Sequence, residues 1–216
     1  MRVLSIPTSV AGRVLIEDAP GAHSGHMLVG CHGYAQNAAI MLDEMRRIPG
    51  ADRWRLVSVQ ALHRFYRRAD ETVVASWMTR EDRDQAIIDN IRYLDRAVAA
   101  AGGDDARSIV FLGFSQGASM AARAAARGAR RAAGLVLLGG DIAADVKDTT
   151  SVHWPRVLVG CGTRDTWYGA RVESDLAFLQ SRGIPHDVVR FEGGHEITDE
   201  LRAALGAWLS DQLPPV

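Results

Sequence analysis

The sequence predicts one α/β domain of three layers, in which helices cover both faces of a mostly parallel central sheet. Short apolar runs alternate with helical patterns along most of the chain, which is typical of this class. The 216 residues, 47% hydrophobic and 24% charged, have an ordinary globular composition and suffice for one substantial core. Because no internal repeat or linker interrupts the pattern, we expect residues 1–216 to form a single domain.

Seven short apolar runs are predicted to be strands. Several of them are apolar on both faces, as strands buried in a parallel sheet are. In chain order they cover residues 14–17, 26–31, 55–59, 108–114, 135–138, 156–161 and 186–191.

Three apolar stripes at helical spacing predict helices that each cover one face of the sheet. The stripes comprise Ile87, Ile91, Leu94 and Val98; Val172, Leu176 and Leu179 ahead of Gly183; and Leu201, Leu205 and Trp208. Thr79 with Asp82 resembles a capping box, and Thr198, followed by two acids, fits a helix N-cap. A further helix is expected to expose the arginines that recur every four residues, Arg123, Arg127 and Arg131.

Composition limits the possible partners. A net charge of −1 gives no electrostatic reason to expect nucleic acid or an anionic membrane as a ligand. No apolar stretch approaches the roughly 20 residues of a membrane span, and the first apolar run is too short for a signal peptide. We therefore expect a cytoplasmic protein without stable membrane association. Cys31 and Cys161 form neither a disulfide framework nor a zinc set, and no metal site is indicated.

The most informative segment is Gly113-Phe114-Ser115-Gln116-Gly117, which lies between an apolar run and an Ala-rich helical stretch. This is the G-x-S-x-G pattern of a nucleophile elbow, in which a sharp turn from strand to helix exposes the serine hydroxyl. The turn needs both glycines because a Cβ at either position would crowd the strained serine. The alternative is that Ser115 is an ordinary turn serine.

A serine hydroxyl needs a histidine to accept its proton and an acid to orient that histidine. Asp165 follows the predicted strand 156–161, and His195 follows the predicted strand 186–191. The carboxyl ends of parallel strands meet at one edge of a sheet, so we expect both side chains near Ser115. Asp141, which follows Gly139-Gly140 after the preceding strand, is the competitor for the acid, and Asp165 could instead be a capping or surface acid.

Acyl transfer also requires two N–H donors for the negative oxygen of the tetrahedral intermediate. One is expected from the backbone of Gln116, directly after the nucleophile, and the other from Tyr34 in the loop His32-Gly33-Tyr34. His32 also follows a strand, but we interpret it as a structural loop histidine.

These motifs resemble the carboxylesterase/phospholipase family of α/β hydrolases, which includes acyl-protein thioesterases. The resemblance runs from about residue 26 to the end and rests on the segments 32–37, 113–117, 162–165 and 194–197. It implies the α/β-hydrolase fold, Ser115, Asp165 and His195 as the catalytic triad, the Tyr34 and Gln116 amides as the oxyanion hole, and no cofactor. It also places a tryptophan segment, Ser76-Trp77-Met78, near the acyl site. With the usual strand order of this fold, Cys31 and Cys161 lie three strand spacings apart, roughly 14 Å, and should be free thiols.

The connection from residue 139 to residue 156 is too short for the cap domain that many α/β hydrolases insert there, so the site is expected to be an open groove. Trp77, Met78, Tyr34 and Trp167 could form its apolar wall, although ordinary core packing explains each of them equally well. The arginines in segment 63–68, Arg64, Arg67 and Arg68, could attract an anionic substrate, but a solvated loop is the favoured interpretation.

The predicted function is a serine hydrolase that cleaves carboxylic esters through an acyl-enzyme intermediate, with a small-molecule ester or thioester as substrate. Acyl thioesterase and lysophospholipase are alternatives, since the sequence departs from thioesterase members at Ala35, Gln36 and Met78-Thr79. A protein that uses the same fold only to bind a ligand is the third possibility. The sequence does not indicate an oligomeric state.

Overall fold

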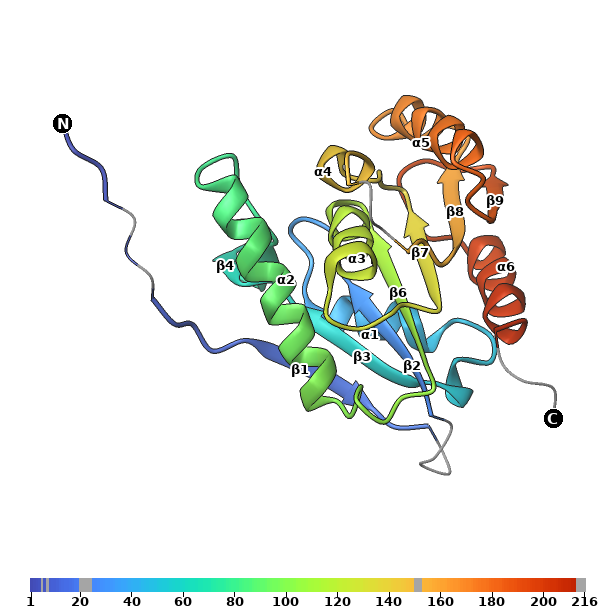
Figure 1. Cartoon of the computed structure of the whole chain (residues 1–216), viewed down its shortest axis with the longest axis horizontal. Helices are drawn as coiled ribbons and strands as arrows, with labels where there is room; N and C mark the ends of the chain where they lie inside the picture. Colours follow the sequence, from blue (N-terminus) through green and yellow to red (C-terminus); the bar gives the residue numbers. More distant parts are fainter. Residues whose placement is uncertain (5, 7, 20–24, 150–152, 213–216) are drawn as a thin grey trace.

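The computed structural model, which describes residues 1–4, 6, 8–19, 25–149 and 153–212, is built around one seven-stranded sheet (Figure 1). All neighbouring strands pair in parallel except β1, which is antiparallel to β3 at one edge. In spatial order the strands are β1 (Arg13–Glu17), β3 (Arg55–Gln60), β2 (His26–Cys31), β6 (Ser108–Phe114), β7 (Gly134–Leu138), β8 (Arg156–Gly162) and β9 (His186–Phe191). The mostly parallel sheet and the seven predicted strands are confirmed, with ends that differ by no more than one residue.

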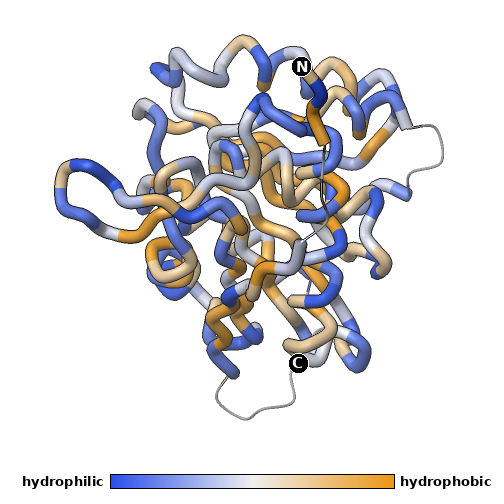
Figure 2. Tube along the Cα trace, turned by 90° about the vertical axis from the view of Figure 1, so that its left-hand side faces the viewer, coloured by the Kyte–Doolittle hydropathy of each residue, from blue (hydrophilic) through white to orange (hydrophobic). Residues whose placement is uncertain are grey.

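Helices cover both faces of this sheet, which gives the predicted three layers. The helices are α1 (Ala38–Arg46), α2 (Arg83–Ala100), α3 (Gln116–Arg127), α4 (Ala144–Lys147), α5 (Gly169–Ser181) and α6 (Asp199–Ser210), with a short 3-10 helix, η1 (Ala51–Arg53). Strand β2 shows the division, because Met27 and Val29 pack in the layer of α2, α3 and α5 whereas Leu28 packs in the layer of α1 and α6. Figure 2 shows apolar residues along the interior strands and hydrophilic residues mainly outside. In the described part of the β7–β8 connection the only helix is the four-residue α4, and no cap domain is present.

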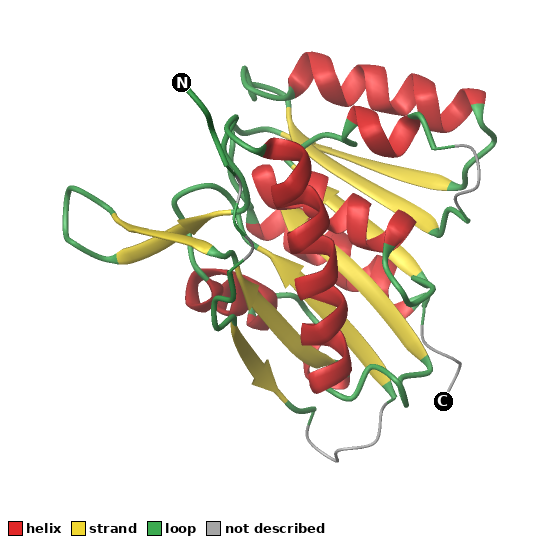
Figure 3. Cartoon of the chain, turned by 60° about the vertical axis from the view of Figure 1, so that its left-hand side comes forward, coloured by secondary structure: helices red, strands yellow, loops and turns green. Residues whose placement is uncertain are grey.

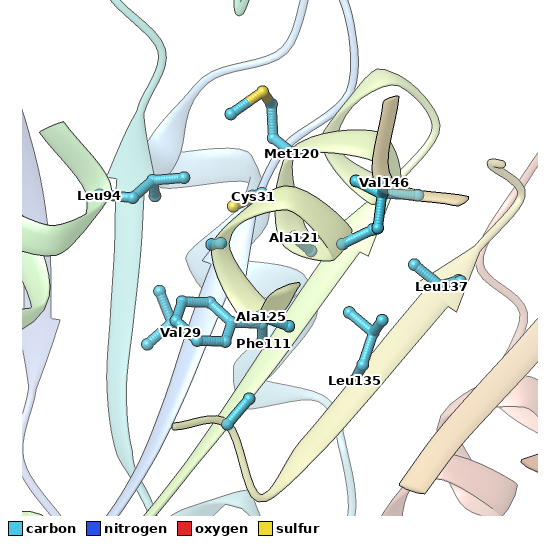
Figure 4. Packing of buried hydrophobic residues seen from close by; sticks show 14 of the residues in the cluster. Val29, Cys31, Leu94, Phe111, Met120, Ala121, Ala125, Leu135, Leu137 and Val146 are labelled. Carbon is cyan, nitrogen blue, oxygen red and sulfur yellow. The ribbon is translucent and has the colours of Figure 1, made fainter. Parts of the chain in front are cut away.

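Small side chains let α3 lie close to the sheet. Ala121 and Ala125 face Phe111 of β6 and Leu135 of β7 in the buried cluster shown in Figure 4. This close packing fixes the helix whose first turn begins directly after Ser115. Because β2, β6, β8 and β9 are parallel, the loops that follow them lie along the same edge of the sheet.

A two-stranded hairpin, β4 (His63–Tyr66) with β5 (Val73–Ser76), was not predicted. The favoured interpretation as a solvated loop is wrong for residues 63–66, which form a strand, but Arg64, Arg67 and Arg68 are all exposed, and the last two lie outside the strand. The hairpin projects from the body of the molecule (Figure 3), so most of β4 is exposed and shows no clear apolar alternation. Its turn is held instead by an Arg67–Asp70 ion pair and a left-handed Glu71.

Three local expectations about helices have different outcomes. Thr198 is the N-cap of α6 and accepts a hydrogen bond from the Leu201 N–H, as predicted. The capping box at Thr79 is wrong, because the helix starts after a left-handed Asp82 that makes no side-chain cap. The exposed arginine face is wrong for Arg123, which is 1% exposed, whereas Arg127 and Arg131 are exposed and Arg131 lies beyond the end of α3. The Arg123 guanidinium forms an ion pair with Asp145 of α4, so the buried positive charge has a partner.

Cys31 and Cys161 are buried free thiols, as expected from strands β2 and β8 being three spacings apart. Burial raises the pKa of both thiols. Within the described ranges, no helix combines the length and apolar character needed to cross a membrane.

Candidate active site

Ser115 occupies a strained turn between β6 and α3. Its backbone has φ 54° and ψ −121°, a region that L-residues rarely adopt. A Cβ at Gly113 would lie 2.3 Å from the Gly117 carbonyl oxygen, and a Cβ at Gly117 would lie 2.0 Å from that of Cys31. Both glycines are therefore required for the helix to approach the strands, as the G-x-S-x-G pattern predicts.

Asp165 and His195 are joined by a hydrogen bond of 2.8 Å between Oδ2 and Nδ1. The other carboxylate oxygen, Oδ1, accepts the backbone N–H groups of Trp167 and Tyr168. Burial raises the pKa of Asp165, but the hydrogen bonds from His195 and these two amides outweigh it, so the pKa is lowered. The carboxylate is therefore ionised near neutral pH, fixed in place, and able to stabilise a charged imidazole.

The His195 ring contacts aromatic residues around the Ser115 turn. Phe114, the residue before the serine, stacks on this ring at 4.9 Å between centroids, and Tyr168 stacks on it at 5.4 Å. Burial raises the pKa of the Tyr168 phenol, while the nearby Ser115 side chain acts in the opposite direction. Gly139 makes room for the ring, since a Cβ there would lie 3.3 Å from His195 Cε1. Asp165 and His195 are thus joined, and the ring lies against the residue before Ser115, but among the described residues no hydrogen bond joins Ser115 to His195.

Asp141, the competing acid, is held elsewhere. Its Oδ1 accepts a hydrogen bond from the Ser119 hydroxyl on α3 at 3.0 Å, and its Oδ2 lies 3.7 Å from an Arg171 nitrogen. The hydrogen bond to His195 is made by Asp165 instead. The hydrogen bond to His195 therefore agrees with the choice of Asp165 over its competitor Asp141.

The loop after β2 passes close to the serine. A Cβ at Gly33 would lie 3.3 Å from Ser115 Cβ, and the loop is pinned by a hydrogen bond from Gly33 N–H to Gln36 Oε1. Ala35 has φ 56° and donates its N–H to Ala75 of the hairpin. Among the described residues, the N–H groups of Tyr34 and Gln116 have no hydrogen-bond acceptor. Both amides are available near Ser115.

The proposed apolar wall is only partly accessible. Trp77 is 0% exposed, packs in the main core and donates its indole N–H to the His32 carbonyl oxygen at 2.8 Å. The expectation that Trp77 faces substrate is therefore wrong, and core packing explains the residue. Met78 is half-buried against the same core. Trp167 and Tyr34 are 71% and 62% exposed, and Trp167 stacks on His195 at 5.2 Å.

Two side chains near the serine carry roles that the sequence analysis missed. The Gln116 amide Oε1 accepts the Trp77 N–H, and its Nε2 donates to the Met78 carbonyl oxygen, which ties the end of β5 to the elbow. Tyr168 contacts both Ser115 and His195. The available signal was its position three residues after Asp165, in the turn whose N–H groups bind that carboxylate.

The described residues contain no group of three His, Cys, Asp or Glu side chains placed to hold a metal ion. Three cavities of about 350–520 Å³ are lined by residues other than the triad. The exposed ring of Trp167 stacks on His195, and the open groove stays a prediction.

Several solved structures similar to this chain are named as esterases or carboxylesterases. Esterase PE8 is 21% identical, with a TM-score of 0.76, and the match covers 94% of this chain and 100% of that one. A carboxylesterase from Mesorhizobium loti is 21% identical, with a TM-score of 0.71 and coverage of 95% and 98%. SOBER1 from Arabidopsis thaliana is 13% identical, with a TM-score of 0.72 and coverage of 87% and 98%.

No family model matches the sequence, and no curated protein matches it either. The structural likeness, at these low identities, establishes the α/β-hydrolase fold, the fold of the carboxylesterase/phospholipase proteins that the motifs resemble.

Proposed function

We propose that this protein is a serine hydrolase that cleaves carboxylic esters through an acyl-enzyme intermediate. The observation that carries the proposal is the hydrogen-bonded Asp165–His195 pair, whose imidazole stacks on Phe114, the residue directly before Ser115 on the strained elbow. This arrangement gives a serine hydroxyl both a proton acceptor and a fixed approach to a carbonyl carbon.

In the first step His195 Nε2 takes the proton of the Ser115 hydroxyl while Oγ attacks the ester carbonyl carbon. Asp165 stabilises the imidazolium and keeps it in the correct orientation. The N–H groups of Tyr34 and Gln116 bind the oxygen that becomes negative. Collapse of the intermediate breaks the bond to the alcohol oxygen, which receives the proton from His195.

In the second step water replaces the alcohol. His195 accepts a proton from the water, the hydroxide attacks the acyl-Ser115 carbonyl, and collapse releases the acid and restores the serine. No step requires a metal ion, so we expect the same rate of hydrolysis in the presence of EDTA. Acyl thioesterase and lysophospholipase activities would use the same steps with a different leaving group.

The exposed rings of Tyr34 and Trp167 are the proposed contacts for the acyl or aryl group. An open groove contacts only the first part of a chain, and each methylene gains about 0.8 kcal/mol only while it is buried. Activity should therefore rise over short acyl lengths and then level or fall. A Trp167→Ala variant should flatten this rise, whereas Met78 is expected to contribute less because it is half-buried.

The test is hydrolysis of p-nitrophenyl esters of increasing acyl length, acyl thioesters and lysophospholipids by the protein and by Ser115→Ala. Ser119→Ala is the matched control, since Ser119 lies one turn further along α3 and binds Asp141. Ser115→Ala should lose several powers of ten in kcat and Ser119→Ala should lose little. Equal activity in Ser115→Ala, or no hydrolysis of any of these substrates, would reject the proposal and favour a ligand-binding role.

A further inference from the structure

A cavity of about 370 Å³ lies two strands away from Ser115, at the β1 edge of the sheet. It is bordered by the start of β1, the end of β3, the first turn of α1 and residues of the β4–β5 hairpin. The residues that matter here are Arg13, Ala39, Gln60, Arg64 and Val73. None of them belongs to the machinery proposed for ester hydrolysis.

Gln60 gives this cavity a buried amide with an unused donor. The residue is 6% exposed, and its Oε1 accepts the backbone N–H of Ala38 at 2.9 Å. Only the oxygen of the amide can accept that bond, so the orientation of the amide group is fixed. Its Nε2 is then buried without an acceptor among the described residues. A buried donor left unpaired is costly, and a bound acceptor would remove that cost.

Two guanidinium groups border the same cavity without a carboxylate partner. Arg64 donates one bond to the Ala11 carbonyl oxygen, and neither Arg64 nor Arg13 forms an ion pair with any described acid. Other arginines at this edge are neutralised, since Arg46 pairs with Glu17 and Arg55 pairs with Asp18. None of the described residues that line the cavity is acidic. The excess positive charge is therefore concentrated there.

The first turn of α1 adds a further donor. Asn37 caps the helix by accepting the Ile40 N–H, and the Ala38 N–H is used by Gln60. The Ala39 N–H, on a residue that lines the cavity, has no acceptor among the described residues. The positive end of the nine-residue helix therefore faces the same space as the two arginines.

We propose that this cavity binds a small organic anion, a carboxylate or phosphate group joined to a compact apolar part. The anionic oxygens would accept hydrogen bonds from the arginines, from Gln60 Nε2 and from the Ala39 N–H. Leu15 and Val73 supply apolar wall for the remainder of the ligand, which the volume of the cavity accommodates. The proposal stands independently of the chemistry at Ser115.

The test is a titration with phenylphosphonate and with benzoate, followed by NMR of the backbone amides and of the Gln60 side-chain NH₂. Saturable shifts should be concentrated at Ala39 and Gln60, at ligand concentrations up to about 20 mM. The stronger of the two probes identifies the preferred anionic group. Benzamide, which has the same ring without the charge, should give no saturable shift.

Variants distinguish binding in this cavity from non-specific attraction of anions to exposed arginines. Arg13→Gln and Arg64→Gln should each weaken binding at least fivefold, and both change exposed side chains, so the fold should persist. Arg68→Gln is the matched control, because Arg68 is exposed on the same hairpin but does not line the cavity. Absence of saturable binding for both anions, or an equal loss in Arg68→Gln, would overturn the proposal.

Discussion

His32 and His195 both follow a strand at the carboxyl edge of the sheet, but their rings are held in opposite ways. His32 is fully buried, with Nδ1 on the Gly33 carbonyl oxygen and Nε2 accepting the Ala61 N–H. His195 has its Nδ1 on the Asp165 carboxylate, while its Nε2 has no hydrogen-bond partner among the described residues. One imidazole is saturated by backbone groups, and the other is anchored at one nitrogen only.

The difference shows how to distinguish a structural histidine from one suited to proton transfer. Because Nε2 of His32 accepts a hydrogen bond, its Nδ1 must carry the proton, and a second proton has no place. Burial lowers the pKa of His32 to about 4, although its bond to the Gly33 carbonyl acts in the opposite direction. His195 leaves its Nε2 available for proton exchange, and the Asp165 carboxylate at Nδ1 stabilises the charged imidazolium.

The largest expected effect is on activity after replacement of each histidine. His195→Gln should reduce kcat by roughly a millionfold, because the serine loses its base. His32→Gln should keep kcat within about tenfold when measured well below its unfolding temperature. Steady-state kinetics on a short-chain ester gives both values, and comparable losses in the two variants would remove the distinction.

The two acids extend the comparison to the partner of His195. Asp165→Asn should lower kcat by roughly a thousandfold or more, since the amide favours the wrong tautomer of the imidazole. Asp141→Asn should have a small effect, because Asp141 binds Ser119 rather than the histidine. If kinetics ranked the two variants in the reverse order, the acid would have been misassigned.

Stability should depend on pH through His32. Its pKa is lower in the folded chain than in the unfolded one, so the stabilisation is complete above pH 6.5 and is lost as pH falls toward 4. From this group alone the free energy of unfolding should fall by about 3 kcal/mol across that interval.

Urea unfolding at several pH values measures this dependence. His32→Gln should be less stable at pH 7 but flatter with pH between 6.5 and 4. Parallel curves for the protein and this variant would show that His32 contributes nothing to the pH dependence.

A smaller effect on kcat is expected at Gly139, whose backbone lies close to the His195 ring. Gly139→Ala places a Cβ 3.3 Å from the His195 ring, at a residue with φ 49°. We expect kcat to fall about tenfold, the equivalent of 1.4 kcal/mol. Gly183→Ala is the matched control, because Gly183 has φ 63° with open space around it. It should lose stability but keep kcat, and a similar loss of kcat in both would assign the effect to backbone strain alone.

The fold and the arrangement of Ser115, Asp165 and His195 could be predicted because each residue follows a recognisable apolar strand. A parallel sheet then brings those strand ends to one edge. Asp165 could be preferred over Asp141 because it follows the strand directly before that of the histidine, and the hydrogen bond to His195 agrees with this choice.

Features that depend on distant partners could not be predicted in this way. Arg123 looked exposed because its ion pair comes from Asp145, in a separate short helix. A tryptophan side chain suits a substrate groove and a buried core equally well. The hydrogen bond from the Trp77 indole N–H to the His32 carbonyl oxygen places it in the core. The hairpin escaped detection because β4 and β5 pair mainly with each other and carry little buried apolar surface on β4.

The most direct test of the central claim is covalent labelling of the protein with a fluorophosphonate, followed by peptide mapping. We predict a single adduct on Ser115 and no adduct in Ser115→Ala. Fast labelling should require His195. Asp141→Asn and His32→Gln should still be labelled at Ser115. An adduct on another serine, or labelling of Ser115 that is unchanged in His195→Gln, would contradict the assignment of Ser115 as a nucleophile activated by His195.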